Sequence, residues 1–243
     1  MEQNILVGLD IGATNTRILI TEKSGKYIYH TKSEDFRQKE KIEKTITRAL
    51  AESERTLSEV FAICAGVAGC PYKDGEGDEL TVKQAYSLLD ISGLTCKRHV
   101  RNDAAIAHMA YFPADQGIVA IAGTGSSIYG VNSSGVPHML PGISVGGWDI
   151  QKESSFEPED LMAQAAIRNE YAIETCNRYV ARLVCGIIYE AEYLELRCCK
   201  LGFGGSVARN DYFKRRIING LRELYQNRLQ IFTKSIAKII ESS

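Results

Sequence analysis

The stretch that most constrains the fold of this chain lies near its N-terminus, in residues 6–20. An apolar run ends at Asp10, the chain turns through Gly12 and small polar residues, and a second apolar run follows. This pattern is typical of two neighbouring strands joined by a tight turn. Turn statistics alone favour an ordinary hairpin over a binding site.

The same turn carries groups that suit a phosphorylated ligand. Gly12 lets the backbone approach a ligand closely, because it has no Cβ atom. Thr14, Asn15 and Thr16 offer side chains and backbone N–H groups to an anion. Asp10, at the end of the first strand, offers the carboxylate oxygens that magnesium prefers. Whether the turn is a site therefore depends on the rest of the chain.

Length and composition narrow the class of protein. With 243 residues, of which 44% are hydrophobic, the chain is expected to form one large or two compact domains. A formal charge of -1 argues against non-specific binding to nucleic acid or membranes. The sequence shows no apolar run that would span a bilayer and no signal-peptide pattern, so we expect a cytoplasmic protein.

The cysteines predict neither a disulfide framework nor a zinc site. None of the seven is spaced as C-x-x-C, and the four histidines do not stand at zinc-finger intervals from them. We therefore expect free thiols in a reducing compartment. The cysteines are Cys64, Cys70, Cys96, Cys176, Cys185, Cys198 and Cys199.

The chain after the opening hairpin alternates between strands and helices. Residues 26–31 are expected to form a third strand, residues 37–54 an amphipathic helix, and residues 60–69 a buried strand that runs into a glycine loop. This order calls for a parallel strand pair with a right-handed crossover. A short helix at residues 81–89 and a strand at residues 96–100 follow.

That last strand ends at Arg101, Asn102 and Asp103, where a helix begins. Asn102 or Asp103 can cap the helix. The Asp103 carboxylate thus lies at a strand-to-helix junction, where open α/β sheets usually bind ligands. Spacing alone leaves a helix cap and a catalytic carboxylate as equal alternatives.

A second turn repeats the plan of the first. Strands at residues 117–122 and 128–131 flank Gly123, Thr124, Gly125 and Ser126. Two turns of glycine and hydroxyl residues are a stronger signal than one, and they indicate two related halves that face one cleft.

The remaining segments predict mostly helix. The expected elements are a loop with a short strand at 137–148, a helical stretch from Pro158 to Ile187 that is broken near 169–171, a strand at 194–201 and a helix at 211–225. Residues 229–243 are compatible with strand or helix.

With these motifs in order, the chain resembles the sugar kinases of the actin, hexokinase and Hsp70 superfamily, and especially the N-acetylglucosamine kinase and BadF/BadG/BcrA/BcrD ATPase group. Residues 10–16 resemble its first phosphate motif and residues 123–126 its second. Residues 101–105 resemble the segment with the catalytic aspartate, and residues 202–206 the adenosine motif. Each motif is weak alone, whereas four in family order are specific.

The resemblance implies an α/β fold of two ribonuclease H-like (actin-like ATPase) domains, residues 1–110 and a shortened 111–243, with a nucleotide cleft between them. It implies ATP and Mg²⁺ as cofactors and a small-molecule sugar as partner, without nucleic acid or membrane, and it is compatible with a homodimer. The implied site residues are Asp103 as general base; Gly12, Thr14, Asn15, Thr16, Gly123, Thr124, Gly125 and Ser126 at the phosphates; Gly204 and Gly205 at the adenosine; Asn102, Asp103, Gly147 and Trp148 at the sugar; and Asp10 at the metal.

The chain departs from the family after Trp148. The usual Gly-Asp-Glu-Gly-Ser sugar loop is replaced by residues 149–155, in which Asp149 or Glu153 could take the acidic role. Trp148 itself suits stacking on a sugar and packing in a loop equally well.

We predict ATP-dependent phosphorylation of a hydroxyl on N-acetylglucosamine or a related hexose or amino sugar. The alternatives are an ATP-hydrolysing activator of the 2-hydroxyacyl-CoA dehydratase type and a non-catalytic sugar- or nucleotide-binding relative. The activators place an iron–sulfur cysteine close to a glycine-rich turn, but no cysteine lies between Cys96 and Cys176. A Rossmann dehydrogenase is disfavoured, since the first glycine turn lacks G-x-G-x-x-G and leads into a strand.

Overall fold

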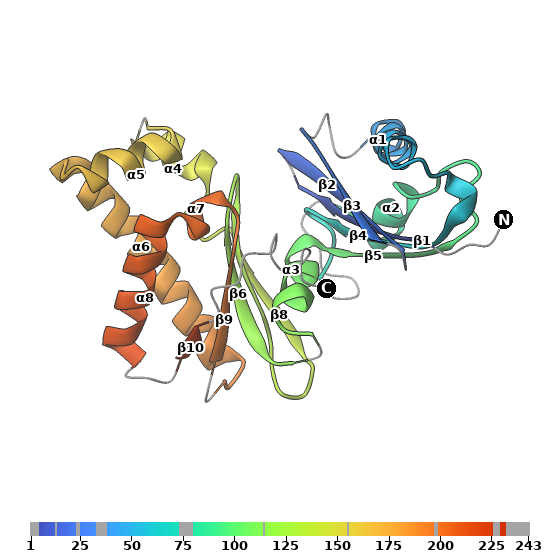
Figure 1. Cartoon of the computed structure of the whole chain (residues 1–243). Coiled ribbons are helices and arrows are strands. Elements are labelled where there is room, and N and C mark those ends of the chain that lie inside the picture. The colour runs from blue at the N-terminus through green and yellow to red at the C-terminus, as the bar shows by residue number, and fades with distance from the viewer. Residues whose placement is uncertain are drawn as a thin grey trace. The chain divides into compact units, whose positions relative to one another are not determined.

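The computed structural model describes residues 5–12, 14–22, 25–32, 38–72, 80–113, 115–154, 156–196, 199–225 and 229–231. The chain forms two compact units, Met1–Ile106 and Ala107–Ser243 (Figure 1). Among the described residues, no helix combines the length and the apolar character needed to cross a lipid bilayer.

The first unit is built on a five-stranded sheet in the order β3-β2-β1-β4-β5. The pairs β1–β2 and β2–β3 are antiparallel, whereas β1–β4 and β4–β5 are parallel. The strands are β1 (Ile5–Ile11), β2 (Asn15–Glu22), β3 (Gly25–Lys32), β4 (Val60–Val67) and β5 (Lys97–Asn102), and the helical elements are α1 (Lys39–Glu52), η1 (Leu57–Glu59) and α2 (Val82–Ser87). The opening hairpin, the third strand and the crossover helix predicted from the sequence are confirmed.

One face of this sheet holds the core of the first unit. Alternate residues of β1, such as Val7 and Leu9, are buried and belong to the same cluster as the apolar stripe of α1, which includes Ile46 and Leu50. Successive side chains of a strand point to opposite faces. Asp10 therefore belongs to the face opposite the core.

The second unit repeats the topology of the first. Its sheet has the order β10-β9-β6-β7-β8, with β6–β7 and β7–β8 antiparallel and β6–β9 and β9–β10 parallel. The strands are β6 (Gly117–Ala122), β7 (Ser126–Val131), β8 (Pro137–Pro141), β9 (Cys199–Gly204) and β10 (Leu229–Ile231). Counted in chain order, both sheets read 3-2-1-4-5, so the similar plan predicted from the two glycine turns extends to the whole sheet.

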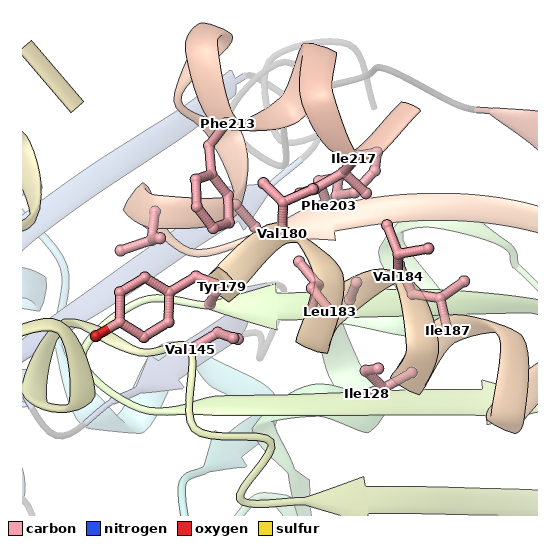
Figure 2. Close-up of a cluster of buried hydrophobic side chains, with 14 of the residues drawn as sticks. Ile128, Val145, Tyr179, Val180, Leu183, Val184, Ile187, Phe203, Phe213 and Ile217 are labelled. Carbon is pink, nitrogen blue, oxygen red and sulfur yellow. The ribbon is translucent and has the colours of Figure 1, made fainter. Parts of the chain in front are cut away.

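Helices complete the second unit. They are α3 (Asp103–Tyr111), which begins at the end of the first unit, and α4 (Gly147–Ser154), α5 (Pro158–Ala166), α6 (Glu170–Tyr193), α7 (Ser206–Arg209) and α8 (Asp211–Tyr225). Figure 2 shows Leu183 and Ile187 of α6 beside Ile128 of β7, with Phe203 and Phe213 in the same apolar cluster. This core anchors α6, which carries Tyr179 and Arg182, two residues that contact α4 and the segment before it.

One predicted boundary in the second unit is confirmed and two differ. The break before α6 is confirmed: Arg168 has a φ of 69° and the Asn169 side chain accepts a hydrogen bond from the Ala172 N–H at 3.1 Å. The predicted strand at 194–201 was placed too early, because α6 continues to Tyr193 and β9 starts at Cys199. Residues 147–154, expected to be a loop, form helix α4.

The end of the chain and the thiols complete the comparison. Residues 229–231 form a strand, while residues 232–243 lie outside the described part. The six described cysteines are free, as predicted; Cys198 lies outside the described residues.

Candidate active site

Two carboxylates lie near each other in the first unit, Asp10 and Asp103. In the sheet register Asp10 of β1 is opposite Arg17 of β2 and Gly66 of β4. Arg17 Nη1 donates to Asp10 Oδ2 at 3.3 Å, and 47% of the Asp10 side chain is exposed. Asp10 thus keeps carboxylate surface accessible at the end of its strand.

Asn102 fixes the junction from which Asp103 projects. Asn102 is buried; its Nδ2 donates to the Cys70 carbonyl at 2.6 Å and its Oδ1 accepts from the Ala104 N–H at 2.8 Å. Asp103 Oδ1 also accepts from that N–H, at 2.9 Å. Both predicted capping residues therefore contribute to the start of α3, and the Asn102 amide is engaged by the backbone behind Asp103.

Gly66 allows α3 to start this close to the sheet. A Cβ atom on Gly66 would lie 3.0 Å from Ile106 Cγ1 and 3.2 Å from Asp103 Cα, which is tighter than ordinary packing. Sequence reasoning did not single out Gly66. Its only signal was the glycine at the end of the predicted 60–69 strand.

The surroundings of Asp103 change its acidity. Burial, followed by the nearby Asp10 carboxylate, raises the pKa of Asp103 to about 6. A carboxyl group with this pKa can accept a proton near neutral pH. Two carboxylates that repel each other also suit a divalent cation, which would relieve that repulsion.

The available carboxylates suit magnesium better than a metal ion that takes all its ligands from the protein. Within the described residues, no group of three or more His, Cys, Asp or Glu side chains could hold an ion. Magnesium usually keeps several waters and binds one or two carboxylates together with substrate phosphates. Asp10 suits that arrangement.

The first glycine turn is compact and open to solvent. The Gly12 N–H donates to the Asn15 carbonyl at 3.1 Å, closing the turn. Thr14 and Asn15 are exposed, whereas Thr16 is buried within β2. Two of the three polar residues predicted to meet phosphate are therefore accessible.

The second turn, in the other unit, is enclosed by two further glycine segments. A Cβ atom on Gly146 would lie 2.6 Å from the carbonyl carbon of Gly125. A Cβ atom on Gly205, which has a φ of 81°, would lie 2.3 Å from the Ala122 carbonyl oxygen and 2.6 Å from the Gly123 nitrogen. No side chain fits at either position, so these contacts explain why glycines occur there.

Backbone hydrogen bonds join the start of α4 to this turn. The Gly147 N–H donates to the Gly123 carbonyl at 2.6 Å and the Trp148 N–H to the Thr124 carbonyl at 3.1 Å. The Val145 N–H donates to Ser126 Oγ at 3.2 Å. Three segments that the sequence marked separately, 123–126, 147–148 and 204–205, are thus brought together. Trp148 lies 62% exposed next to them.

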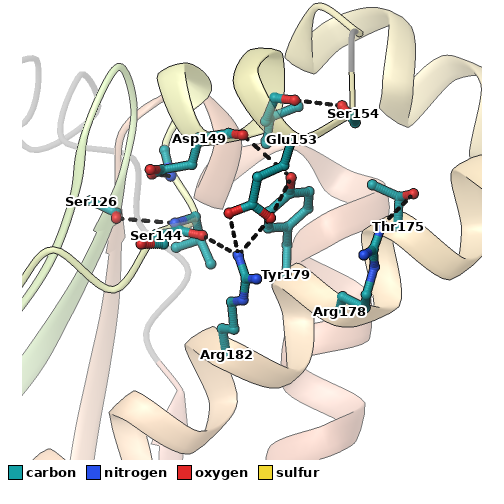
Figure 3. A network of polar contacts seen from close by, with 12 residues as sticks. Ser126, Ser144, Asp149, Glu153, Ser154, Thr175, Arg178, Tyr179 and Arg182 are labelled. Carbon is teal, nitrogen blue, oxygen red and sulfur yellow. Dashed lines mark hydrogen bonds and ion pairs between the residues drawn. The ribbon is translucent and has the colours of Figure 1, made fainter.

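Both acidic residues proposed for the altered loop are engaged inside the second unit. Asp149 Oδ2 accepts from the Gly146 N–H at 2.9 Å. Both carboxylate oxygens of Glu153 accept from Arg182 Nη1 at 3.0 Å, and Tyr179 Oη donates to Glu153 at 3.3 Å (Figure 3). The hydrogen bond from Arg182 holds the pKa of Glu153 below its usual value. Sequence reasoning found neither Arg182 nor Tyr179 as partners, because helical periodicity does not reveal a contact with a distant loop.

Two solved structures share this fold across nearly the whole chain. A ROK family protein from Streptococcus pneumoniae, in complex with sucrose, has a TM-score of 0.65 and 14% identity, over 98% of this chain and 97% of that one. A ROK family glucokinase from Streptomyces griseus, in complex with glucose and AMPPNP, has a TM-score of 0.64 and 14% identity, over 95% of this chain and 92% of that one. At these identities the likeness establishes an α/β fold like that of sugar kinases.

Sequence comparison adds a more similar relative. An N-acetylmuramic acid/N-acetylglucosamine kinase of Clostridium acetobutylicum is 30% identical over 141 residues, which are 54% of this chain and 43% of the relative. The chain thus covers less than half the length of this curated relative. Residues 7–146, with both glycine turns and Asp103 among them, match the BadF/BadG/BcrA/BcrD ATPase family, and the chain belongs to that family.

Proposed function

We propose that this chain carries out ATP-dependent phosphorylation of a sugar hydroxyl, with N-acetylglucosamine or a related hexose or amino sugar as acceptor, in the cytoplasm. The observation that carries the proposal is the placement of Asp103 at a strand-to-helix junction beside Asp10, with its pKa raised to about 6. The kinase name of the Clostridium relative supports the same reaction class and also suggests N-acetylmuramic acid as an acceptor.

Asp103 is the proposed general base. It accepts the proton of the sugar hydroxyl while that oxygen forms a bond to the γ-phosphorus, and the bond from this phosphorus to the bridging oxygen of ADP breaks. Such a transfer depends mainly on positioning and neutralisation of charge, with a carboxylate to receive the proton. Asn102 holds the backbone on which Asp103 stands.

The nucleotide is assigned to the glycine turns. Gly12, Thr14, Asn15 and Thr16 in one unit, and Gly123, Thr124, Gly125 and Ser126 in the other, are proposed to contact the phosphates, with Gly204 and Gly205 at the adenosine. Asp10 would hold magnesium, which would neutralise phosphate charge. The proposal takes the two units as ribonuclease H-like domains, and their shared strand order supports this.

The sugar is assigned to Asp103 at the start of α3 and to Gly147 and Trp148 at the start of α4. Asn102, also predicted as a sugar contact, is buried with its amide bound to backbone groups, so we assign it to holding Asp103. The exposed Trp148 ring is available to stack on a sugar face. Asp149 and Glu153 are bound to protein groups, however. This engagement favours, as a second candidate, a relative that binds sugar or nucleotide without turnover.

A coupled ADP-release assay with Mg-ATP separates the two candidates. The acceptors to compare are N-acetylglucosamine, N-acetylmuramic acid, N-acetylmannosamine, glucose and mannose. Asp103→Asn should lower kcat by about 10²- to 10⁴-fold while Mg-ATP still binds. Asp90→Asn is the matched control, since Asp90 is an exposed carboxylate of the same unit paired with Arg98.

One result would contradict the kinase proposal: ATP binding by the unmodified chain with no acceptor-dependent turnover above that of Asp103→Asn, which would favour the non-catalytic candidate. Equal loss of activity in Asp103→Asn and Asp90→Asn would instead contradict the assignment of Asp103 as general base.

A further inference from the structure

We propose that Arg182 is a positioning residue for the second glycine turn: from α6 it fixes residues 144–148, which in turn fix residues 123–126. Among the described residues Arg182 donates to Ser144 and Glu153 and to no group of residues 123–126, so its action on the turn passes through residues 144–148. The consequence for ATP rests on the function proposed above, whereas the consequence for the backbone does not.

The first step is the unusual backbone of Ser144. Its φ is 53°, in the left-handed region that residues with a side chain rarely adopt. Arg182 Nη1 donates to the Ser144 carbonyl oxygen at 3.0 Å (Figure 3). The guanidinium therefore fixes the direction of a peptide group that has little intrinsic preference for this conformation.

The second step is the contact between the residues after Ser144 and the turn. The carbonyl oxygens of Gly123 and Thr124 accept from the N–H groups of Gly147 and Trp148. A carbonyl oxygen carries partial negative charge and would repel a phosphate. Keeping both carbonyls directed at α4 is thus a condition for an anion site at this turn.

The third step is the grip of Arg182 on the other end of the same segment. Its Nη1 also bonds both oxygens of Glu153, near the end of α4. The Arg182 side chain therefore binds Ser144, which precedes the residues that contact the turn, and Glu153, near the end of α4. Tyr179 is buried in the core and donates to the same carboxylate, which orients Glu153.

The exposure of this ion pair predicts the kind of effect that its loss will have. The Arg182 and Glu153 side chains are 40% and 36% exposed. Exposed pairs add little to overall stability because solvent screens them. We therefore expect loss of Arg182 to disturb the local geometry of residues 123–126 more than the stability of the unit.

Arg178 provides a matched control on the same helix. It is an exposed arginine one turn earlier, and its Nη2 donates to Thr175 Oγ1, on its own helix, at 3.3 Å. Among the described residues it makes no hydrogen bond to residues 144–153. Arg178→Gln removes the same charge without removing the proposed brace.

The backbone test is hydrogen–deuterium exchange of the ligand-free chain. In Arg182→Gln, amides of residues 123–126 should exchange about tenfold faster, while those in the middle of β6 keep their rates. Arg178→Gln should match the unmodified protein. Equal exchange in the two variants, or a uniform increase over the whole second unit, would overturn the inference.

The functional test is Mg-ATP affinity by titration calorimetry, together with the KM for ATP. Arg182→Gln should raise the Kd and KM for ATP about tenfold, with Arg182→Lys in between. An unchanged ATP affinity in Arg182→Gln would overturn the functional half. Failure of the unmodified chain to bind Mg-ATP would count against the proposed function instead, and hydrogen exchange would still decide the role of Arg182.

Discussion

The two glycine turns occupy equivalent positions in sheets of the same topology, yet they are built differently. The first closes on itself through one hydrogen bond from Gly12 to Asn15 and belongs to the unit that holds Asp10 and Asp103. The second also has an internal hydrogen bond, from the Gly123 N–H to the Gly125 carbonyl at 2.9 Å, but it is in addition shaped from outside, by Gly146 and Gly205 packing against its backbone. The first unit therefore carries ionisable groups near its turn, whereas the conformation of the second turn is determined by close backbone packing.

The largest effect is expected from placing a side chain in the enclosed turn. Gly205→Ala should destabilise the second unit by about 3 kcal/mol or more, because the new Cβ would overlap the Ala122 carbonyl and the φ is positive. Gly135→Ala shares a positive φ of 77° but meets no atom within 4 Å, so it should cost only about 1–2 kcal/mol. Urea unfolding followed by circular dichroism measures both. Equal costs would show that packing against the turn is unimportant.

In the first unit, replacing Asp103 by Asn is expected to raise stability, and the gain should depend on pH. The pKa of Asp103 is raised from 3.8 to about 6, so the folded state binds a proton that the unfolded chain has already lost between these values. Stability from this group is present at low pH and lost as the pH rises through 6. Asp103→Asn should therefore stabilise the protein by about 1–3 kcal/mol at pH 8, with a much smaller gain at pH 4.5.

Thermal melts at the two pH values measure this difference. Asp90→Asn should behave in the opposite way, because the hydrogen bond from Arg98 lowers the pKa of Asp90 and its contribution is present at high pH. A Tm gain for Asp103→Asn that is the same at pH 4.5 and pH 8 would contradict the electrostatic explanation.

A smaller contrast is expected between glycines inside the two turns. A Cβ on Gly12 would lie 3.2 Å from the Asn15 carbonyl oxygen, whereas a Cβ on Gly125 would meet nothing within 4 Å. Gly12→Ala should thus lower stability by about 1 kcal/mol and Gly125→Ala by less than about 0.5 kcal/mol. Denaturation midpoints give both values, and the reverse order would contradict the description of the two turns.

The smallest expected signal is spectroscopic. Trp148 is the only tryptophan and is 62% exposed beside the second turn. Binding of an acceptor sugar should shift its fluorescence to shorter wavelength, since stacking removes water from the ring. A saturating acceptor that supports turnover without changing the emission would exclude Trp148 from the sugar site.

The elements that were predicted correctly are those determined by short stretches of sequence. The helix at 211–225, the break before α6 and the junction at Asp103 follow from periodicity and capping residues. Helix α4 was missed, because its first residues are Gly147 and Trp148 and its contacts are to a turn far away in the sequence. The close packing at Gly66 and the ion pair between Arg182 and Glu153 were missed for the same reason, because each depends on a residue from another element.

The order in which the parallel strands pair has a consequence for folding. The chain between Ile118 and its partner Leu201 is longer than that between Val7 and Ile63, so β9 closes a larger loop than β4. The hairpins that carry both glycine turns can therefore form early. Gly205 follows β9 and reaches the second turn only after that loop has closed. Gly205, which is assigned to the adenosine, would therefore reach its native contacts later than the hairpins reach theirs.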